Sequence, residues 1–140
     1  MSAVIPDGFE QHYKQAGFTD PWEPLLSRVL DDEVQIGVVL RDAHCNSRGM
    51  PHGAFLTALA DMASGLSIGR VIVARGLEAG SLVTTNLSID YLGQAQVGDW
   101  IATATTVHKV GRAQCVATCL LSTPERLVAR CSTTFMNRLP

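Results

Sequence analysis

Residues 53–69, which read GAFLTALADMASGLSIG, decide the fold. Large apolar side chains recur in this stretch at spacings of four, three and four residues: Phe55, Leu59, Met62 and Leu66. At 100° per residue they form one face of an α-helix. The opposite flank carries Ala54, Ala58, Asp61 and Gly65. The sequence therefore predicts one long helix from Gly53 to about Gly69, with a lone carboxylate among residues that have almost no side chain.

The rest of the chain has the pattern of β-strands. Apolar and β-branched residues mark five segments: 34–40, 83–91, 100–110, 113–122 and 127–135. Turns at 93–98, 109–112 and 123–126 join the last four of them as antiparallel neighbours. A long apolar helix among five strands needs more cover than one neighbour provides. We therefore expect an α+β fold in which a curved antiparallel sheet wraps around the helix.

The N-terminal part predicts less regular structure. Residues 6–17 form a candidate short helix, with Phe9 and Tyr13 one turn apart and Gly17 at its end. No repeat or linker divides the chain, so we expect a single domain over 1–140. Within it, an arm that is helical or irregular covers 1–30, and the core covers 34–137.

Composition excludes several classes of protein. The 140 residues are 46% hydrophobic and carry a net charge of −2, which does not fit the basic surface of a non-specific nucleic-acid binder. No uncharged stretch reaches the ~20 residues of a membrane span, so we expect no membrane segment. The first ten residues lack the pattern of a secretion signal, and we expect a cytoplasmic protein. The four cysteines contain no C-x-x-C pair and predict free thiols rather than a zinc site.

Most of the candidate functional residues lie just before the predicted helix or near its start. Residues 44–54 read HCNSRGMPHGA, and Asp61 follows nine residues after His52. This stretch resembles the acyl-CoA thioesterases of the hotdog fold, in particular the phenylacetic-acid-pathway type with its N-x-x-G-x-x-H-G-G signature. The resemblance covers about Val34 to Asn137 and departs at Ala54, where the family has a second glycine. It implies the hotdog fold and hydrolysis of an acyl-CoA to a free acid and coenzyme A.

The resemblance also implies roles for individual residues. Asp61 matches the acidic residue that acts as general base or as nucleophile, and the sequence leaves both mechanisms open. Gly53 lies where a helix begins, so its unpaired N–H can stabilise the negative charge that develops on a thioester oxygen. Asn46 is assigned to polarising the same carbonyl. Gly49 belongs to the substrate-binding loop, or is an ordinary loop former.

Other candidates keep a second interpretation. His52 is a possible base, but we expect it to orient the loop through its ring. Thr84 aligns with the residue that orients water, while its neighbour Thr85 points to the other face of the strand and is a candidate substrate contact. Lys109 and Arg112, at a hairpin tip, either bind the phosphates of coenzyme A or are solvated turn charges.

The family pattern implies partners as well. It predicts a dimer with the active sites at the interface and a tetramer built as a dimer of dimers, without a metal or redox cofactor. Two other functions remain open, a hotdog hydratase or dehydratase of acyl thioesters and a non-catalytic acyl-CoA sensor. The match of residues 65–69 to G-x-S-x-G is set aside, because a nucleophile elbow needs a strand before Ser67. Cys45 has no base partner that the sequence supports.

Overall fold

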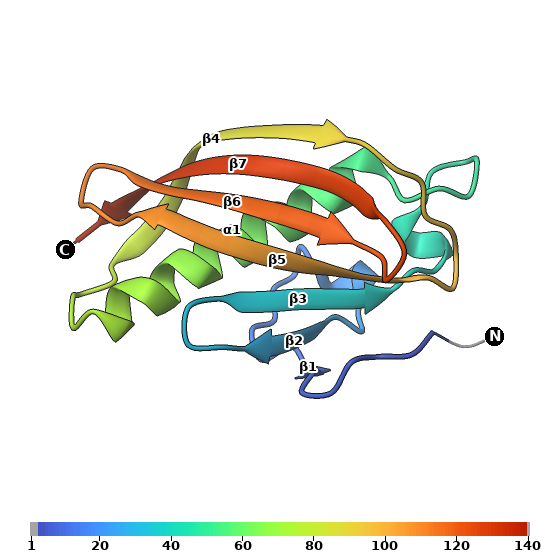
Figure 1. Ribbon diagram of the computed structural model, residues 1–140, viewed down its shortest axis with the longest axis horizontal. Helices are drawn as coiled ribbons and strands as arrows, with labels where there is room; N and C mark the ends of the chain where they lie inside the picture. The colour runs from blue at the N-terminus through green and yellow to red at the C-terminus, as the bar shows by residue number, and fades with distance from the viewer. Residues whose placement is uncertain (1–2, 140) are drawn as a thin grey trace.

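The computed structural model describes residues 3–139 and shows one long helix packed against one antiparallel sheet (Figure 1). The predicted limits 1–140 include residues 1, 2 and 140, which lie outside this range. The helix is α1 (Gly53–Ala74). The strands are β1 (Glu10–Gln11), β2 (Leu26–Val29), β3 (Val34–Val39), β4 (Ser81–Tyr91), β5 (Trp100–Lys109), β6 (Cys115–Ser122) and β7 (Leu127–Arg138). Their order across the sheet is β1-β2-β3-β5-β6-β7-β4. Of two short 3₁₀ helices, η1 (Asp20–Trp22) lies between β1 and β2, and η2 (Asp42–His44) lies between β3 and α1.

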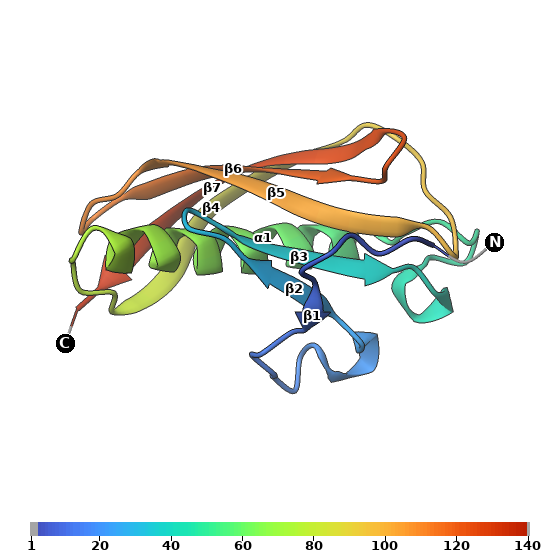
Figure 2. The ribbon, with the colours of Figure 1, turned by 60° about the horizontal axis from the view of Figure 1, so that its bottom comes forward.

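The core lies between α1 and the concave side of the sheet (Figure 2). Phe55, Leu59 and Ile68 of the helix are almost completely buried, and so are Ile36 and Ile101 of the sheet. Full burial of one such side chain is worth about 1.5–3 kcal/mol. The predicted curved sheet around one helix is confirmed. Among the described residues, α1 is also the one helix that is long and apolar enough to cross a membrane by length and composition alone.

The helix continues beyond its predicted end. Gly69 does not stop it, because Ile68 and Ile72 extend the buried side by another turn. The helix ends at Ala74, and two residues later Gly76 has a φ of +73°, which favours glycine. The N–H of Leu77 bonds to the carbonyl of Ile72 and that of Gly76 to the carbonyl of Val73, which is the Schellman arrangement. The predicted helix ended at about Gly69, but packing outweighs the weak helix propensity of that glycine.

The predicted helix over 6–17 is wrong. Gly8 has a φ of +91°, and Glu10–Gln11 pair with β2 as a short strand. Phe9 packs edge-on against Trp100 at 4.9 Å, and the Arg28 guanidinium lies 4.7 Å from the Phe9 ring centroid. A helix of about twelve residues is marginal alone, so these contacts with the sheet decide the conformation. Strands β1 and β2 were not among the five predicted, so the sheet has seven strands.

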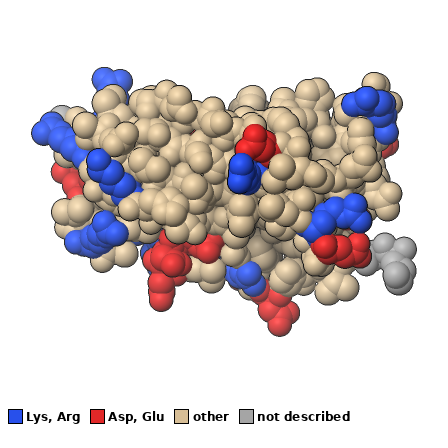
Figure 3. Space-filling view, turned by 45° about the horizontal axis from the view of Figure 1, so that its top comes forward, with Lys and Arg blue, Asp and Glu red and all other residues tan. Residues whose placement is uncertain are grey.

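Strand β4 forms one edge of the sheet. It pairs with β7 on one side only, and most of its side chains are exposed. The face shown in Figure 3 carries separated charges over broad uncharged areas. Among the described residues one ion pair is present, between Arg130 of β7 and Asp90 of β4, and it is largely exposed. An open edge strand of eleven residues is a natural site for pairing with another chain.

Two buried histidines make stability depend on pH. The His44 ring stacks on Phe55 at 4.4 Å, Nδ1 accepts the N–H of Arg41, and Nε2 lies 2.9 Å from the carbonyl oxygen of Trp22. Burial lowers the pKa of His44 from 6.5, and it lowers that of His12 in the same way. As pH falls below about 6.5, the unfolded chain takes up these protons first, so the folded state loses stability.

We therefore expect the melting temperature of the wild type to fall between pH 7.5 and pH 5.5. His44→Asn should melt lower at pH 7.5 but show a smaller fall, because one of the two histidines no longer contributes. Thermal unfolding followed by circular dichroism at both pH values measures the difference. An identical fall in the two proteins would contradict the assignment to His44.

Candidate active site

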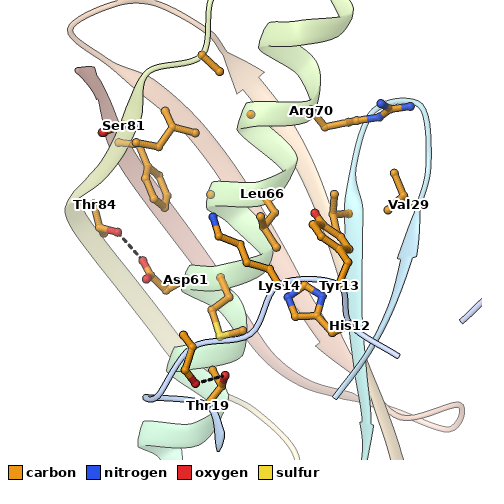
Figure 4. Close-up of a pocket in the computed structure, with 18 of the residues that line it drawn as sticks. His12, Tyr13, Lys14, Thr19, Val29, Asp61, Leu66, Arg70, Ser81 and Thr84 are labelled. Carbon is orange, nitrogen blue, oxygen red and sulfur yellow. Dashed lines mark hydrogen bonds between the residues drawn. The ribbon is translucent and has the colours of Figure 1, made fainter. Parts of the chain in front are cut away.

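Asp61 and Thr84 form the centre of the site. Asp61 lies on the flank of α1 that faces β4, and the Thr84 hydroxyl donates a hydrogen bond of 2.6 Å to its Oδ1 (Figure 4). Both residues line a cavity of about 1070 Å³. The second carboxylate oxygen has no protein partner among the described residues. Thr84 therefore orients the carboxylate and leaves one oxygen available to accept a proton.

Only one of the two neighbouring threonines reaches this carboxylate. The pairing of β4 with β7 shifts register between Thr84 and Asn86. The Thr85 hydroxyl instead donates to the backbone oxygen of Thr134 at 3.1 Å, within the sheet. The structure thus brings Thr84 to Asp61, whereas the Thr85 side chain bonds to the neighbouring strand β7.

The loop before α1 is shaped by Asn46. Its Oδ1 accepts the N–H groups of Arg48 and Met50 at 2.9 and 3.2 Å, and its own N–H bonds to the Met50 carbonyl. Gly49 has a φ of +78°, which the turn requires. These bonds fix the orientation of the Asn46 amide. Its NH₂ group is the side that remains to donate to a ligand.

The start of α1 presents a free backbone donor. His52 caps the helix, because its Nδ1 accepts the N–H of Ala54 at 3.0 Å. The N–H of Gly53, the residue between them, has no acceptor among the described residues. It is one of the unpaired donors that every helix N-terminus carries, and the helix dipole adds partial positive charge there. The ring of His52 thus contributes to the shape of this donor site.

Tyr91 supports the same turn, and the sequence analysis did not single it out. Its hydroxyl lies 3.0 Å from the Gly53 carbonyl oxygen and 2.6 Å from the Thr57 hydroxyl. A Cβ at Gly53 would come within 3.1 Å of the Tyr91 ring. Tyr91 ends the alternating β4 segment, and no motif distinguishes it from an ordinary strand aromatic. The glycine therefore allows close contact between the helix start and β4.

The predicted residues do not all meet within one chain. Gly53 and Asp61 are eight residues apart on α1, which corresponds to a rise of about 12 Å. Lys109 and Arg112 lie on the β5–β6 hairpin, near the other end of the helix (Figure 1). Lys109 Nζ donates to Gln114 Oε1 at 3.1 Å, and Arg112 lines a separate shallow groove. A single chain therefore has the carboxylate, the backbone donor and the two cations at separate places.

Other side chains that could act as nucleophiles or bind a metal ion are poorly suited to these roles. Burial and the nearby Asp42 raise the pKa of the Cys45 thiol, and burial raises those of Cys119 and Cys131 to about 11 and about 12. Ser67 is fully buried inside α1, where its hydroxyl bonds to the backbone of Val34. The described residues contain no cluster of His, Cys, Asp and Glu suited to a metal ion. Of the residues considered as reactive groups, Asp61 is the one whose carboxylate lines the cavity.

The Tyr91 hydroxyl should contribute measurably to stability. We expect Tyr91→Phe to lower the free energy of unfolding by about 1 kcal/mol, the typical net value of a hydrogen bond. Urea denaturation measures this value. Tyr13→Phe is the matched control, because Tyr13 is exposed and makes no side-chain hydrogen bond within the described chain. Equal stabilities of Tyr91→Phe and the wild type would show that the Tyr91 hydroxyl holds nothing in place.

Comparison with known proteins identifies the family. The family model described as "Thioesterase superfamily" matches residues 48–130, more than half of the chain. A protein of Pseudomonas aeruginosa named "Putative esterase PA0474" is 34% identical over 133 residues, which cover 94% of this chain and 96% of that protein.

Solved structures share the fold. Zebrafish thioesterase superfamily member 2 has a TM-score of 0.77 at 24% identity, covering 89% of this chain and 88% of its own. A hypothetical thioesterase from Streptococcus pneumoniae, solved with coenzyme A, has a TM-score of 0.69 at 26% identity, covering 82% and 89%. The predicted resemblance is confirmed: this chain belongs to the thioesterase superfamily and is a thioester hydrolase with the hotdog fold.

Proposed function

We propose that the protein hydrolyses acyl-CoA thioesters and that Asp61 is the residue that drives the reaction. The observation that carries this proposal is the carboxylate of Asp61, held by Thr84 at the wall of the large cavity. The Streptococcus pneumoniae relative solved with coenzyme A supports the choice of substrate. The chemistry needs a base or nucleophile and a donor to the carbonyl oxygen, so no metal or redox cofactor enters it.

Two routes lead to the same products. In one, the free oxygen of Asp61 takes a proton from water as the water attacks the thioester carbon. In the other, Asp61 attacks that carbon itself, and water then hydrolyses the acyl-enzyme. In both, the C–S bond breaks and coenzyme A leaves as its thiol. Thr84 keeps the carboxylate oriented while either step occurs.

The developing negative charge on the carbonyl oxygen requires a donor. The unpaired N–H of Gly53 is suited to this role, with the Asn46 amide beside the same loop. One such donor is worth about 3–4 kcal/mol in other acyl-transfer enzymes. Because about 12 Å of helix separates Gly53 from Asp61 in one chain, we place Gly53 of the partner subunit next to Asp61.

The open edge of the sheet supports this shared site. Strand β4 carries Thr84 and ends at Tyr91, which contacts Gly53. Antiparallel pairing of two β4 edges would place the start of one helix toward the middle of the other, as a two-fold dimer requires. We propose that two such dimers form a tetramer. Lys109 and Arg112 are the proposed contacts to the coenzyme A phosphates.

Substitution of the carboxylate tests the function. We expect Asp61→Asn to lower kcat for acyl-CoA hydrolysis at least ~100-fold, because a positioned acid or base contributes at least that much. Thiol release from a panel of short, medium, long and aromatic acyl-CoAs measures it. Asp32→Asn, a substitution in the exposed β2–β3 turn, is the control and should retain activity. Tight binding without turnover in the wild type would point instead to a sensor.

Mixing of two inactive variants tests the shared site. Gly53→Pro removes the backbone N–H and is compatible with the first position of a helix. If each site takes Asp61 from one subunit and Gly53 from the other, a heterodimer of Asp61→Asn and Gly53→Pro contains one intact site. Unfolding and refolding them together at equal amounts should restore about one quarter of the wild-type activity, because half of the dimers are mixed and each has one working site of two. No recovery from two variants that each refold as oligomers would place the whole site in one chain.

A further inference from the structure

The cavity beside Asp61 extends along α1 well beyond the catalytic residues. Four residues at intervals of four line it along the helix: Asp61, Gly65, Gly69 and Val73. Such spacing places them in one inclined row that turns by about 40° at each step, and Gly69 lies about 12 Å further along the helix than Asp61. The volume of about 1070 Å³ is at the upper end for small-molecule sites. There is room for a group much longer than acetyl.

The two glycines keep this row open. A Cβ at Gly69 would make an ordinary contact of 3.6 Å with Leu82, and one at Gly65 would come within 3.2 Å of the Phe135 ring. Leu82 and Phe135 also line the cavity, so its floor is apolar. A larger side chain at position 69 would extend from the helix into the cavity. The glycines thus leave a channel that starts at the carboxylate.

The N-terminal arm forms the opposite wall. His12, Tyr13, Lys14 and Phe18 line the cavity, and Figure 4 shows His12, Tyr13 and Lys14 across from Leu66 and the helix. The arm is held at both ends. Phe9 packs on Trp100 before it, and Phe18 packs on Trp22 at 4.9 Å after it. Between them, the N–H of His12 bonds to the carbonyl of Leu25 at 2.9 Å.

The side chains that line the cavity are mainly uncharged and apolar. Phe18, Val29, Met62, Leu66, Leu82 and Phe135 contribute to it. His12 is 2% exposed, and burial lowers its pKa, so the His12 side chain is neutral at pH 7. Lys14 and Arg70 are exposed, and Arg70 Nε is engaged by the carbonyl of Leu30. Their charges therefore lie where solvent reaches them.

We infer that residues 12–18 form one wall of the acyl pocket and that the pocket takes a neutral, extended apolar acyl chain lying over Gly65 and Gly69. The inference rests on the proposed acyl-CoA hydrolysis and adds the substrate class. The thioester carbon must lie beside Asp61. The channel that begins there runs along the helix and is lined mainly by apolar side chains. A medium or long aliphatic chain fills it, whereas a short acyl group leaves most of it empty.

A blocking substitution tests the channel. Gly69→Leu should lower kcat/KM for decanoyl-CoA at least about tenfold and change that for butyryl-CoA less than about twofold, because only the longer chain reaches position 69. Ala74→Leu is the matched control: it adds the same side chain to an exposed position of the same helix that does not line the cavity. It should leave both substrates unchanged.

A second variant tests the arm. Tyr13→Ser removes an aromatic side chain of the arm that lines the cavity across from Leu66, five residues beyond Asp61 on the helix, and should raise KM for decanoyl-CoA several-fold without changing butyryl-CoA turnover. Equal losses on both esters from Gly69→Leu, or no loss on either, would overturn the inference. Faster turnover of suberyl-CoA than of octanoyl-CoA, which has the same number of carbons without the terminal carboxylate, would overturn the assignment of a neutral chain.

Binding separates this inference from the proposed reaction. Calorimetry with decanoyl-CoA on Asp61→Asn, and on Asp61→Asn combined with Gly69→Leu, reports on the pocket without any turnover. We expect at least about tenfold weaker binding in the double variant. Weaker binding together with an inactive wild type would overturn the proposed hydrolysis and keep the pocket. Equal binding by the two variants, with an active wild type, would overturn the pocket and keep the proposed hydrolysis.

Discussion

The need to cover a 22-residue apolar helix determines the rest of the molecule. No single neighbour covers α1, and the sheet therefore curves around it from β3 to β4. This leaves one flank of the helix away from the core. Asp61 lies on that flank beside the edge strand, so the same packing that stabilises the fold also places the carboxylate next to Thr84.

The site is held by elements that are rigid and far apart in the sequence. Asp61 is on the helix and Thr84 on β4, and Tyr91 at the end of that strand contacts the helix start at Gly53. Hydrogen bonds at two different points along the helix therefore connect α1 to β4. A reactive carboxylate held between packed elements keeps its geometry better than one on a loop.

Much of this could be predicted because it depends on local pattern. The stripe from Phe55 to Leu66 predicts the helix, and the family signature from Asn46 to Gly53 gives the fold and the class of reaction. The predictions were wrong where the conformation depends on contacts between residues that are far apart in the sequence. Residues 10–11 form a short strand in place of the predicted helix, because Phe9 packs on Trp100, about ninety positions along the sequence. Gly69 continues the helix because Ile72 is buried, and Tyr91 matters through a contact with Gly53 that no spacing reveals.

The arm is attached to the core mainly by aromatic packing and by its short pairing with β2, and its residues 12–18 are separate in sequence from those around Asp61. Insertions, deletions and substitutions in such a segment leave the helix, the sheet and the carboxylate in place. In the proposed pocket, natural selection can therefore change which acyl groups are accepted by altering the seven residues 12–18. The catalytic residues then remain as they are while relatives diverge in substrate, and the arm is the part of the chain where that divergence should concentrate.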